Sequence, residues 1–252
     1  MNKKIELFMS IALLFCAVFL ARQGALFVKA QTDRARTHHL QDSTELPSTD
    51  YSEPITMSDF CIVIDAGHGG ADPGKVGVNN ILEKDINLSV ALLLAEKLLS
   101  EGISTILTRD SDIDFADGAS NFKSADMRNR CQHIIDANPI FTISIHQNSY
   151  PAEDVTGAQV FYFTHSKEGN DLANMLQNSL IQNVDPSNTR HPKANDSYYL
   201  LKKTPTPTVI VECGFLSSPS EAVLLTTPEY QAKLVDAIYL GILEYLKSSH
   251  YL

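Results

Sequence analysis

Three apolar, β-prone runs in this chain each lead into a side chain that can bind a metal or carry a proton. Short apolar runs bounded by turn residues are typical of buried strands. The runs and the side chains that follow them are 61–66 with His68, 140–145 with His146, and 208–211 with Glu212. We therefore expect three strands that present two imidazoles and one carboxylate.

These strands belong to a regular alternation of predicted strands and helices. Further strands are expected at 103–107, 157–163 and 198–202, and helices at 83–99, 124–137, 168–184, 219–225 and 229–247. The alternation predicts an α/β fold: a single domain over residues 59–252 with a mostly parallel, twisted sheet and helices on both faces. Sites in such sheets form beyond the carboxyl ends of the strands. The site is therefore expected at the C-terminal edge of the strands.

Glu83 joins this edge because it opens the first predicted helix, directly after the glycine-rich turn. Two imidazoles and one carboxylate are a standard catalytic zinc set, which leaves a fourth position open for water. We predict one zinc ion per domain, held by His68, Glu83 and His146. Glu212 is then the expected general base, and Asp65 is the expected residue that orients a ligand histidine.

Each of these residues also has a purely structural interpretation when it is taken alone. Glu83 could be a first-turn carboxylate that faces the helix dipole, with Asn80 as the cap. His146 could be a hydrogen-bonded core histidine, and Glu212 could pair with a lysine. Their shared position after apolar strands favours the metal site, because three coincidences would otherwise be needed.

The glycines around His68 raise the alternative of a phosphate-binding loop. The segment 69–75 resembles such a loop up to Lys75, but Val76 stands where serine or threonine is needed. The spacing therefore excludes this alternative.

Composition limits the possible partners and the redox chemistry. The 252 residues include 20 Lys and Arg against 30 Asp and Glu, a net charge of −10, which argues against a nucleic-acid surface. The cysteines of the predicted domain, Cys61, Cys131 and Cys213, have no paired or metal-binding spacing, so we expect small buried side chains. A catalytic thiol at Cys213 is the less favoured alternative.

The N-terminal segment has the features of an export sequence. Lys3 and Lys4 precede an apolar run, and residues 28–30 form a small-residue cleavage site. Residues 1–30 are therefore a signal peptide or an uncleaved membrane anchor, with membrane association through residues 5–28. Residues 31–58 are polar without apolar periodicity, which predicts a disordered linker. We expect an exported, extracytoplasmic protein.

The motifs of the predicted domain resemble those of the zinc-dependent N-acetylmuramoyl-L-alanine amidases of the amidase-3 type. The matching segments are IVIDAGHGGADPG, EKDINL, TRD, DMRNR, SIHQNS, GAQVFYF and VIVECGFLSSPSEAVLL. The resemblance implies that His68, Glu83 and His146 are zinc ligands and that Glu212 is the catalytic glutamate. It also implies a substrate, the amide that joins N-acetylmuramic acid to L-alanine in peptidoglycan.

Within this family, the compact plan is most similar to the spore-cortex, germination-specific amidases. The loop after His146 is too short for the inhibitory helix of division-associated relatives, so control by an activating protein partner is one expectation. Arg190, Lys193 and Asn148 are candidate substrate contacts because they are polar and lie near the predicted site in sequence. A silent wall-binding scaffold and a zinc carboxypeptidase or deacetylase remain alternatives.

Overall fold

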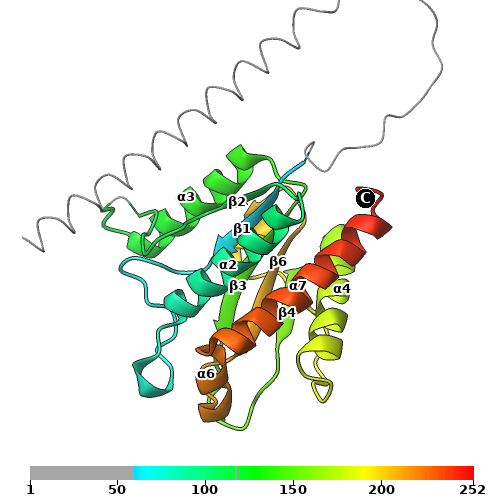
Figure 1. Cartoon of the computed structure of the whole chain (residues 1–252). Coiled ribbons are helices and arrows are strands. Elements are labelled where there is room, and N and C mark those ends of the chain that lie inside the picture. The colour runs from blue at the N-terminus through cyan, green and yellow to red at the C-terminus, as the bar shows by residue number, and fades with distance from the viewer. Residues whose placement is uncertain (1–59, 117) are drawn as a thin grey trace, which may run out of the picture. The chain divides into compact units, whose positions relative to one another are not determined.

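The computed structural model describes residues 60–116 and 118–252 (Figure 1). The predicted export segment 1–30 and linker 31–58 lie outside the described residues. Among the residues that the structure describes, no helix is long and apolar enough to span a membrane.

A single sheet of six strands organises the described residues, in the order β2-β1-β3-β6-β4-β5. All neighbouring strands are parallel except β4 and β6, which are antiparallel. The strands are β1 (Ile62–Ala66), β2 (Thr105–Leu107), β3 (Phe141–Asn148), β4 (Gln159–Phe163), β5 (Lys193–Asn195) and β6 (Thr208–Phe215). The predicted mostly parallel α/β sheet is confirmed.

Helices cover both faces of this sheet. The helices are α2 (Glu83–Ser100), α3 (Phe122–Ala137), α4 (Lys167–Asn183), α5 (Tyr199–Lys203), α6 (Pro219–Leu225) and α7 (Pro228–Ser248), with a short 3-10 turn, η1 (Val78–Asn80). Helices α2, α4 and α7 lie together over one face, whereas α3 lies behind the sheet (Figure 1). Alternate residues of β1 divide between the layers: Ile62 and Ile64 pack into the main core, and Val63 packs against Ile134 of α3.

Helix α2 forms where helical spacing of apolar residues predicts it. Its buried side chains include Ile86, Val90, Leu94 and Leu98, which recur on one face. It ends at Ser100, and Gly102 follows in the left-handed region with a φ of +81°. The burial of this face fixes Glu83, at the first turn of the helix, relative to the sheet.

Two predictions between β4 and β6 are wrong. The expected strand 198–202 is instead the helix α5, because its backbone forms hydrogen bonds within the segment, from Lys202 N to Tyr198 O and from Thr204 N to Leu200 O. The sequence pattern also does not predict strand β5, which lies in the polar stretch before α5. It pairs with β4 through backbone hydrogen bonds and its side chains are largely exposed, so it shows no apolar alternation.

Candidate metal centre

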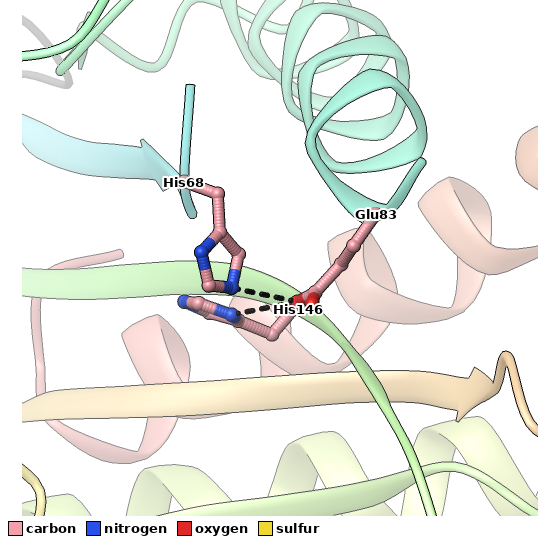
Figure 2. A group of neighbouring side chains, drawn as sticks. All are labelled: His68, Glu83 and His146. Atoms are coloured by element: carbon pink, nitrogen blue, oxygen red, sulfur yellow. Dashed lines mark hydrogen bonds and ion pairs between the residues drawn. The ribbon is translucent and has the colours of Figure 1, made fainter. Parts of the chain in front are cut away.

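His68, Glu83 and His146 meet at the carboxyl edge of the sheet, as predicted (Figure 2). Strands β1 and β3 are adjacent, so their ends deliver the two histidines side by side, and the first residue of α2 supplies the carboxylate. Glu83 Oε1 lies 3.2 Å from His68 Nε2 and 3.0 Å from His146 Nδ1. One ligand atom from each residue lies within 4.8 Å of the others, a spacing that could hold one metal ion.

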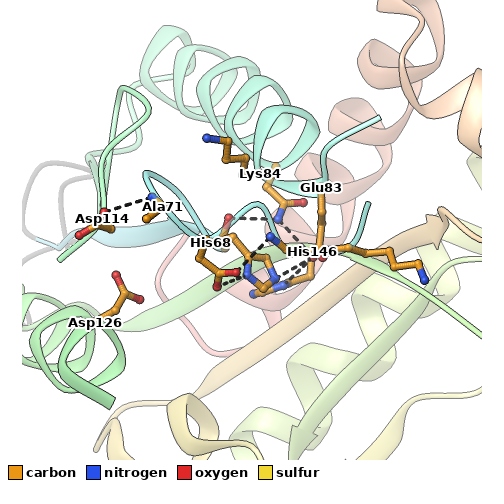
Figure 3. Close-up of polar contacts among 12 residues, drawn as sticks. His68, Ala71, Glu83, Lys84, Asp114, Asp126 and His146 are labelled. Atoms are coloured by element: carbon orange, nitrogen blue, oxygen red, sulfur yellow. Dashed lines mark hydrogen bonds and ion pairs between the residues drawn. The ribbon is translucent and has the colours of Figure 1, made fainter. Parts of the chain in front are cut away.

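The turn after β1 aims His68 through an unusual backbone. His68 has a φ of +62°, a left-handed conformation that non-glycine residues rarely adopt outside functional sites. Gly69 and Gly70 continue the turn with φ values of +132° and +54°. The loop 110–114 supports the turn, since Gly70 N donates to Asp112 and Ala71 N donates to Asp114 (Figure 3).

Glu83 is a buried carboxylate that faces the histidines. Its Oε2 accepts a 2.7 Å hydrogen bond from Lys75 N, and its Oε1 accepts one of 3.1 Å from Gln147 N. Burial alone would raise the pKa of Glu83, but hydrogen bonds and charge interactions with His146 and His68 lower it well below its usual range. Asn80 does not cap α2. Glu83 therefore presents an ionised carboxylate to the two histidines.

Asp72, and not Asp65, contacts a histidine of this cluster. His68 Nδ1 lies 2.7 Å from Asp72 Oδ2, which leaves Nε2 facing Glu83. Burial would lower the pKa of His68, but its hydrogen bonds with Glu83 and Asp72 raise it to about 9. A carboxylate on the far nitrogen fixes the orientation of a ligand imidazole. In the sequence, the position of Asp72 four residues after His68 is the one feature that could indicate this contact.

The predicted role of Asp65 is therefore wrong. Its side chain is buried on the sheet face that Ser144 also occupies, where it accepts hydrogen bonds from Arg130 Nη1 at 2.7 Å, Ser144 Oγ at 2.6 Å and Thr108 Oγ1 at 2.7 Å. Burial opposes ionisation, but Arg130 and Ser144 lower the pKa of Asp65 to about 2. Asp65 lies at the wall of the cleft, but its hydrogen bonds go to Arg130, Ser144 and Thr108 and to neither histidine.

Glu212 lies beside His146 in the sheet register and is nearly buried. Its Oε2 has no hydrogen-bond partner among the described residues, and no lysine pairs with it there. Burial raises the pKa of Glu212 to about 7. A carboxyl group that titrates near neutral pH, with a free oxygen in a metal-competent cleft, is suited to proton transfer.

A cleft of about 470 Å³ contains these groups. Asn148 lines it, as do Lys75 and Lys123, which were not predicted. Arg190 and Lys193 do not line it. The Arg190 guanidinium lies over the Phe215 ring at 4.6 Å, and Lys193 lies 5.8 Å from the centre of the Phe161 ring. The structure therefore does not bring Arg190 and Lys193 to the site.

The cysteines of the described residues play no part in this chemistry. Cys61, Cys131 and Cys213 are free, and the latter two are buried. Burial raises the pKa of the Cys213 thiol to about 12, so it is not a nucleophile at neutral pH.

Gly67 is required at the site because a Cβ there would lie 2.3 Å from the His146 ring. We expect Gly67→Ala to displace this ring and to reduce zinc affinity by about 10- to 100-fold, the usual effect of disturbing a ligand's supports. Metal content of the purified variant measures the effect. Gly241→Ala is a matched control, because its Cβ would crowd Leu176 in the core away from the site. The control should lose stability and keep its zinc; equal zinc loss in both variants would contradict the prediction.

Together, the mostly parallel sheet and the His–Glu–His cluster beside Glu212, whose Oε2 has no partner among the described residues, are the arrangement expected of a metal-dependent hydrolase. The N-acetylmuramoyl-L-alanine amidase family matches residues 62–244, and the chain belongs to this family.

Individual relatives agree with this assignment. The germination-specific N-acetylmuramoyl-L-alanine amidase of Bacillus subtilis (strain 168) is 40% identical over 195 residues, which cover 76% of this chain and 81% of the relative. The structure of the CwlD amidase from Clostridioides difficile in complex with the GerS lipoprotein is similar, with a TM-score of 0.73 and 38% identity over 75% of this chain and 99% of that one. The amidase AmiC2 of Nostoc punctiforme has a TM-score of 0.66 and 33% identity, covering 75% and 97%.

Proposed function

We propose that this protein is a zinc-dependent amidase of peptidoglycan. It hydrolyses the amide between the lactyl group of N-acetylmuramic acid and the L-alanine of the stem peptide. The observation that carries this proposal is the free Oε2 of Glu212 in the same cleft as His68, Glu83 and His146, in a member of the amidase family.

The donor set fits zinc. Two imidazole nitrogens and one carboxylate oxygen are ligands that zinc prefers, and three protein ligands are the number found in catalytic sites. When bound, zinc supplies Lewis-acid chemistry, polarising a carbonyl and lowering the pKa of water.

The chain's own residues move the proton and hold the ligands. Glu212 takes a proton from the attacking water at Oε2 and passes it to the nitrogen of L-alanine as the carbon–nitrogen bond breaks. The products are a lactyl carboxyl group and a free amine. Asp72 orients His68, and the backbone N–H groups of Lys75 and Gln147 hold Glu83.

Zinc removal should reverse the pH dependence of stability. Without zinc, in the presence of chelator, the pKa of His68 is raised to about 9. Protonated His68 therefore contributes fully to the free energy of unfolding below about pH 6.5, and this contribution is lost as the pH rises toward 9. With zinc bound, protons compete with the metal for the His68 nitrogen. The free energy of unfolding therefore rises with pH in the lower part of the range from about pH 6.5 to about pH 9. Thermal unfolding of the domain at several pH values, with zinc and with chelator, checks this. Parallel pH profiles in the two conditions would contradict it.

We propose the spore cortex as the site of action, because a germination-specific amidase is a 40% identical relative. This location requires export, which residues 1–30 provide as a signal peptide or membrane anchor, with residues 31–58 as the linker. Expression of a fluorescent fusion in a spore-forming host tests the location. Signal confined to the cytoplasm would exclude it.

A protein partner is proposed to aid zinc retention, because the similar CwlD amidase was solved in complex with a lipoprotein. Three protein ligands on separate segments leave the site dependent on preorganisation that a partner can supply. Zinc content of the purified domain, measured alone and after mixing with candidate lipoproteins, tests this. Full zinc occupancy of the domain alone would remove the need for a partner.

The proposed reaction is tested by mass spectrometry of digested peptidoglycan. An amidase releases complete stem peptides and leaves the glycan intact. Shortened stems would indicate a carboxypeptidase, and loss of acetate would indicate a deacetylase. No products, with saturating zinc and the candidate partner present, would favour a silent scaffold.

A further inference from the structure

Two buried arginines donate hydrogen bonds to three successive carbonyl groups of the turn that carries His68. Ala66 O accepts from Arg109 Nε at 2.9 Å and from Arg130 Nη1 at 2.9 Å. Gly67 O accepts from Arg109 Nη2 at 3.0 Å, and His68 O accepts from Arg130 Nη2 at 2.9 Å. The backbone on both sides of His68 is thus held by guanidinium groups.

These hydrogen bonds explain how the turn keeps its conformation. The left-handed φ of His68 is costly and persists only where the surroundings fix it. Ala66 is the last residue of β1 and the next two residues lie beyond it, and a buried carbonyl without a donor is also costly. Arginine meets both needs because its planar group presents five N–H donors in a fixed geometry.

Arg109 also connects the segments that carry two ligands. Its Nη2 donates both to Gly67 O and to Lys84 O, the latter at 2.9 Å. Gly67 precedes His68 in the chain, and Lys84 follows Glu83. One nitrogen therefore fixes the distance between the backbone of the first ligand and that of the second.

Arg130 is held by two carboxylates. It is 2% exposed and pairs with Asp65 at 2.7 Å and with Asp126 at 3.4 Å. Both terminal nitrogens already contact the turn's carbonyl oxygens. Although Arg130 lies at the wall of the cleft, its donors are occupied, which makes a direct role in substrate binding the poorer explanation.

We infer that Arg109 and Arg130 are positioning residues that set zinc affinity through the backbone of His68 and Glu83. They stand in the TRD and DMRNR motifs, to which the proposed reaction gives no role. The inference rests on the proposed function, because it takes zinc as the ion that the cluster holds.

The test compares Arg130→Lys and Arg109→Lys with wild type in three measurements. Zinc affinity is measured by competition with a chromophoric chelator, site geometry by the visible spectrum of the cobalt-substituted protein, and folding by thermal unfolding in chelator. Lysine keeps the charge but cannot reproduce the forked contacts. We expect zinc affinity to fall about 10- to 100-fold and the cobalt spectrum to change.

Asp126→Asn is the matched control. It weakens the anchoring of Arg130 without removing a carbonyl contact, so it should lower the unfolding temperature and keep zinc affinity within about threefold of wild type. A purely structural role predicts the same zinc affinity in the lysine variants as in this control.

Wild-type zinc affinity and cobalt spectrum in both lysine variants would overturn the inference. If Arg130→Lys does not fold, Arg109→Lys decides the question, because Arg109 pairs with no carboxylate among the described residues and its replacement leaves no buried acid unpaired. If wild type itself binds no zinc, the proposed function fails instead.

Discussion

Glu212→Gln is expected to lower kcat by about 1,000-fold while the protein keeps its zinc. The amide retains the size of the carboxyl group but cannot accept the proton of the attacking water. The free Oε2 of Glu212 forms no hydrogen bond among the described residues, so its replacement breaks none there. Turnover of peptidoglycan and metal content, measured on the same preparation, give the two quantities.

Glu221→Gln is the matched control for Glu212→Gln. Glu221 is also a buried glutamate near β6, but it accepts hydrogen bonds from Gly157 N and Phe215 N and lies outside the cleft. We expect this control to lose stability and to retain kcat. Loss of zinc from Glu212→Gln would show that Glu212 is a ligand, and retained turnover would show that it is not the base.

His68→Ala should differ from Glu212→Gln in its effect on the metal: the protein should lose its zinc and remain folded. Removing one of three protein ligands leaves two donors and an uncompensated Glu83, so we expect zinc affinity to fall by more than about 1,000-fold, beyond the loss from a supporting residue. Activity should then be undetectable at zinc concentrations that saturate wild type. Metal content after dialysis and a zinc titration measure the change.

Asp72→Asn gives the graded comparison for His68→Ala. It removes the charge from the partner of His68 Nδ1 and keeps all three ligands, so zinc affinity should fall only about 10- to 100-fold. Equal losses in the two variants would contradict the assignment of Asp72 as a supporting residue. Stoichiometric zinc in His68→Ala would contradict the assignment of His68 as a ligand.

The sequence predicts the ligand cluster well because its members follow long-range rules of the α/β fold. His68 follows β1 and His146 lies near the end of β3, and parallel strands bring their carboxyl ends to one edge. Glu83 opens a strongly periodic helix next to that edge. Apolar pattern alone therefore places all three residues.

The supporting contacts could not be predicted because they depend on individual backbone atoms. Arg109 donates only to carbonyl oxygens, which every residue carries, so no pattern in the chain reveals its partners. The sequence predicts Asp65 in place of Asp72 for the same reason: the backbone hydrogen bonds between Gly69 and Asp72 close the turn and bring Asp72 to His68. Strand β5 was missed because backbone pairing at a sheet edge needs no apolar side chains.

The most direct test of the central claim is digestion of purified peptidoglycan by the zinc-loaded protein in water labelled with heavy oxygen. Attack by water at the lactyl carbonyl, with Glu212 as the base, places the label in the new carboxyl group of muramic acid. We expect one labelled oxygen there and none in the released stem peptide, whose L-alanine carries a free amine. Label in the stem peptide, or in released acetate, would contradict it.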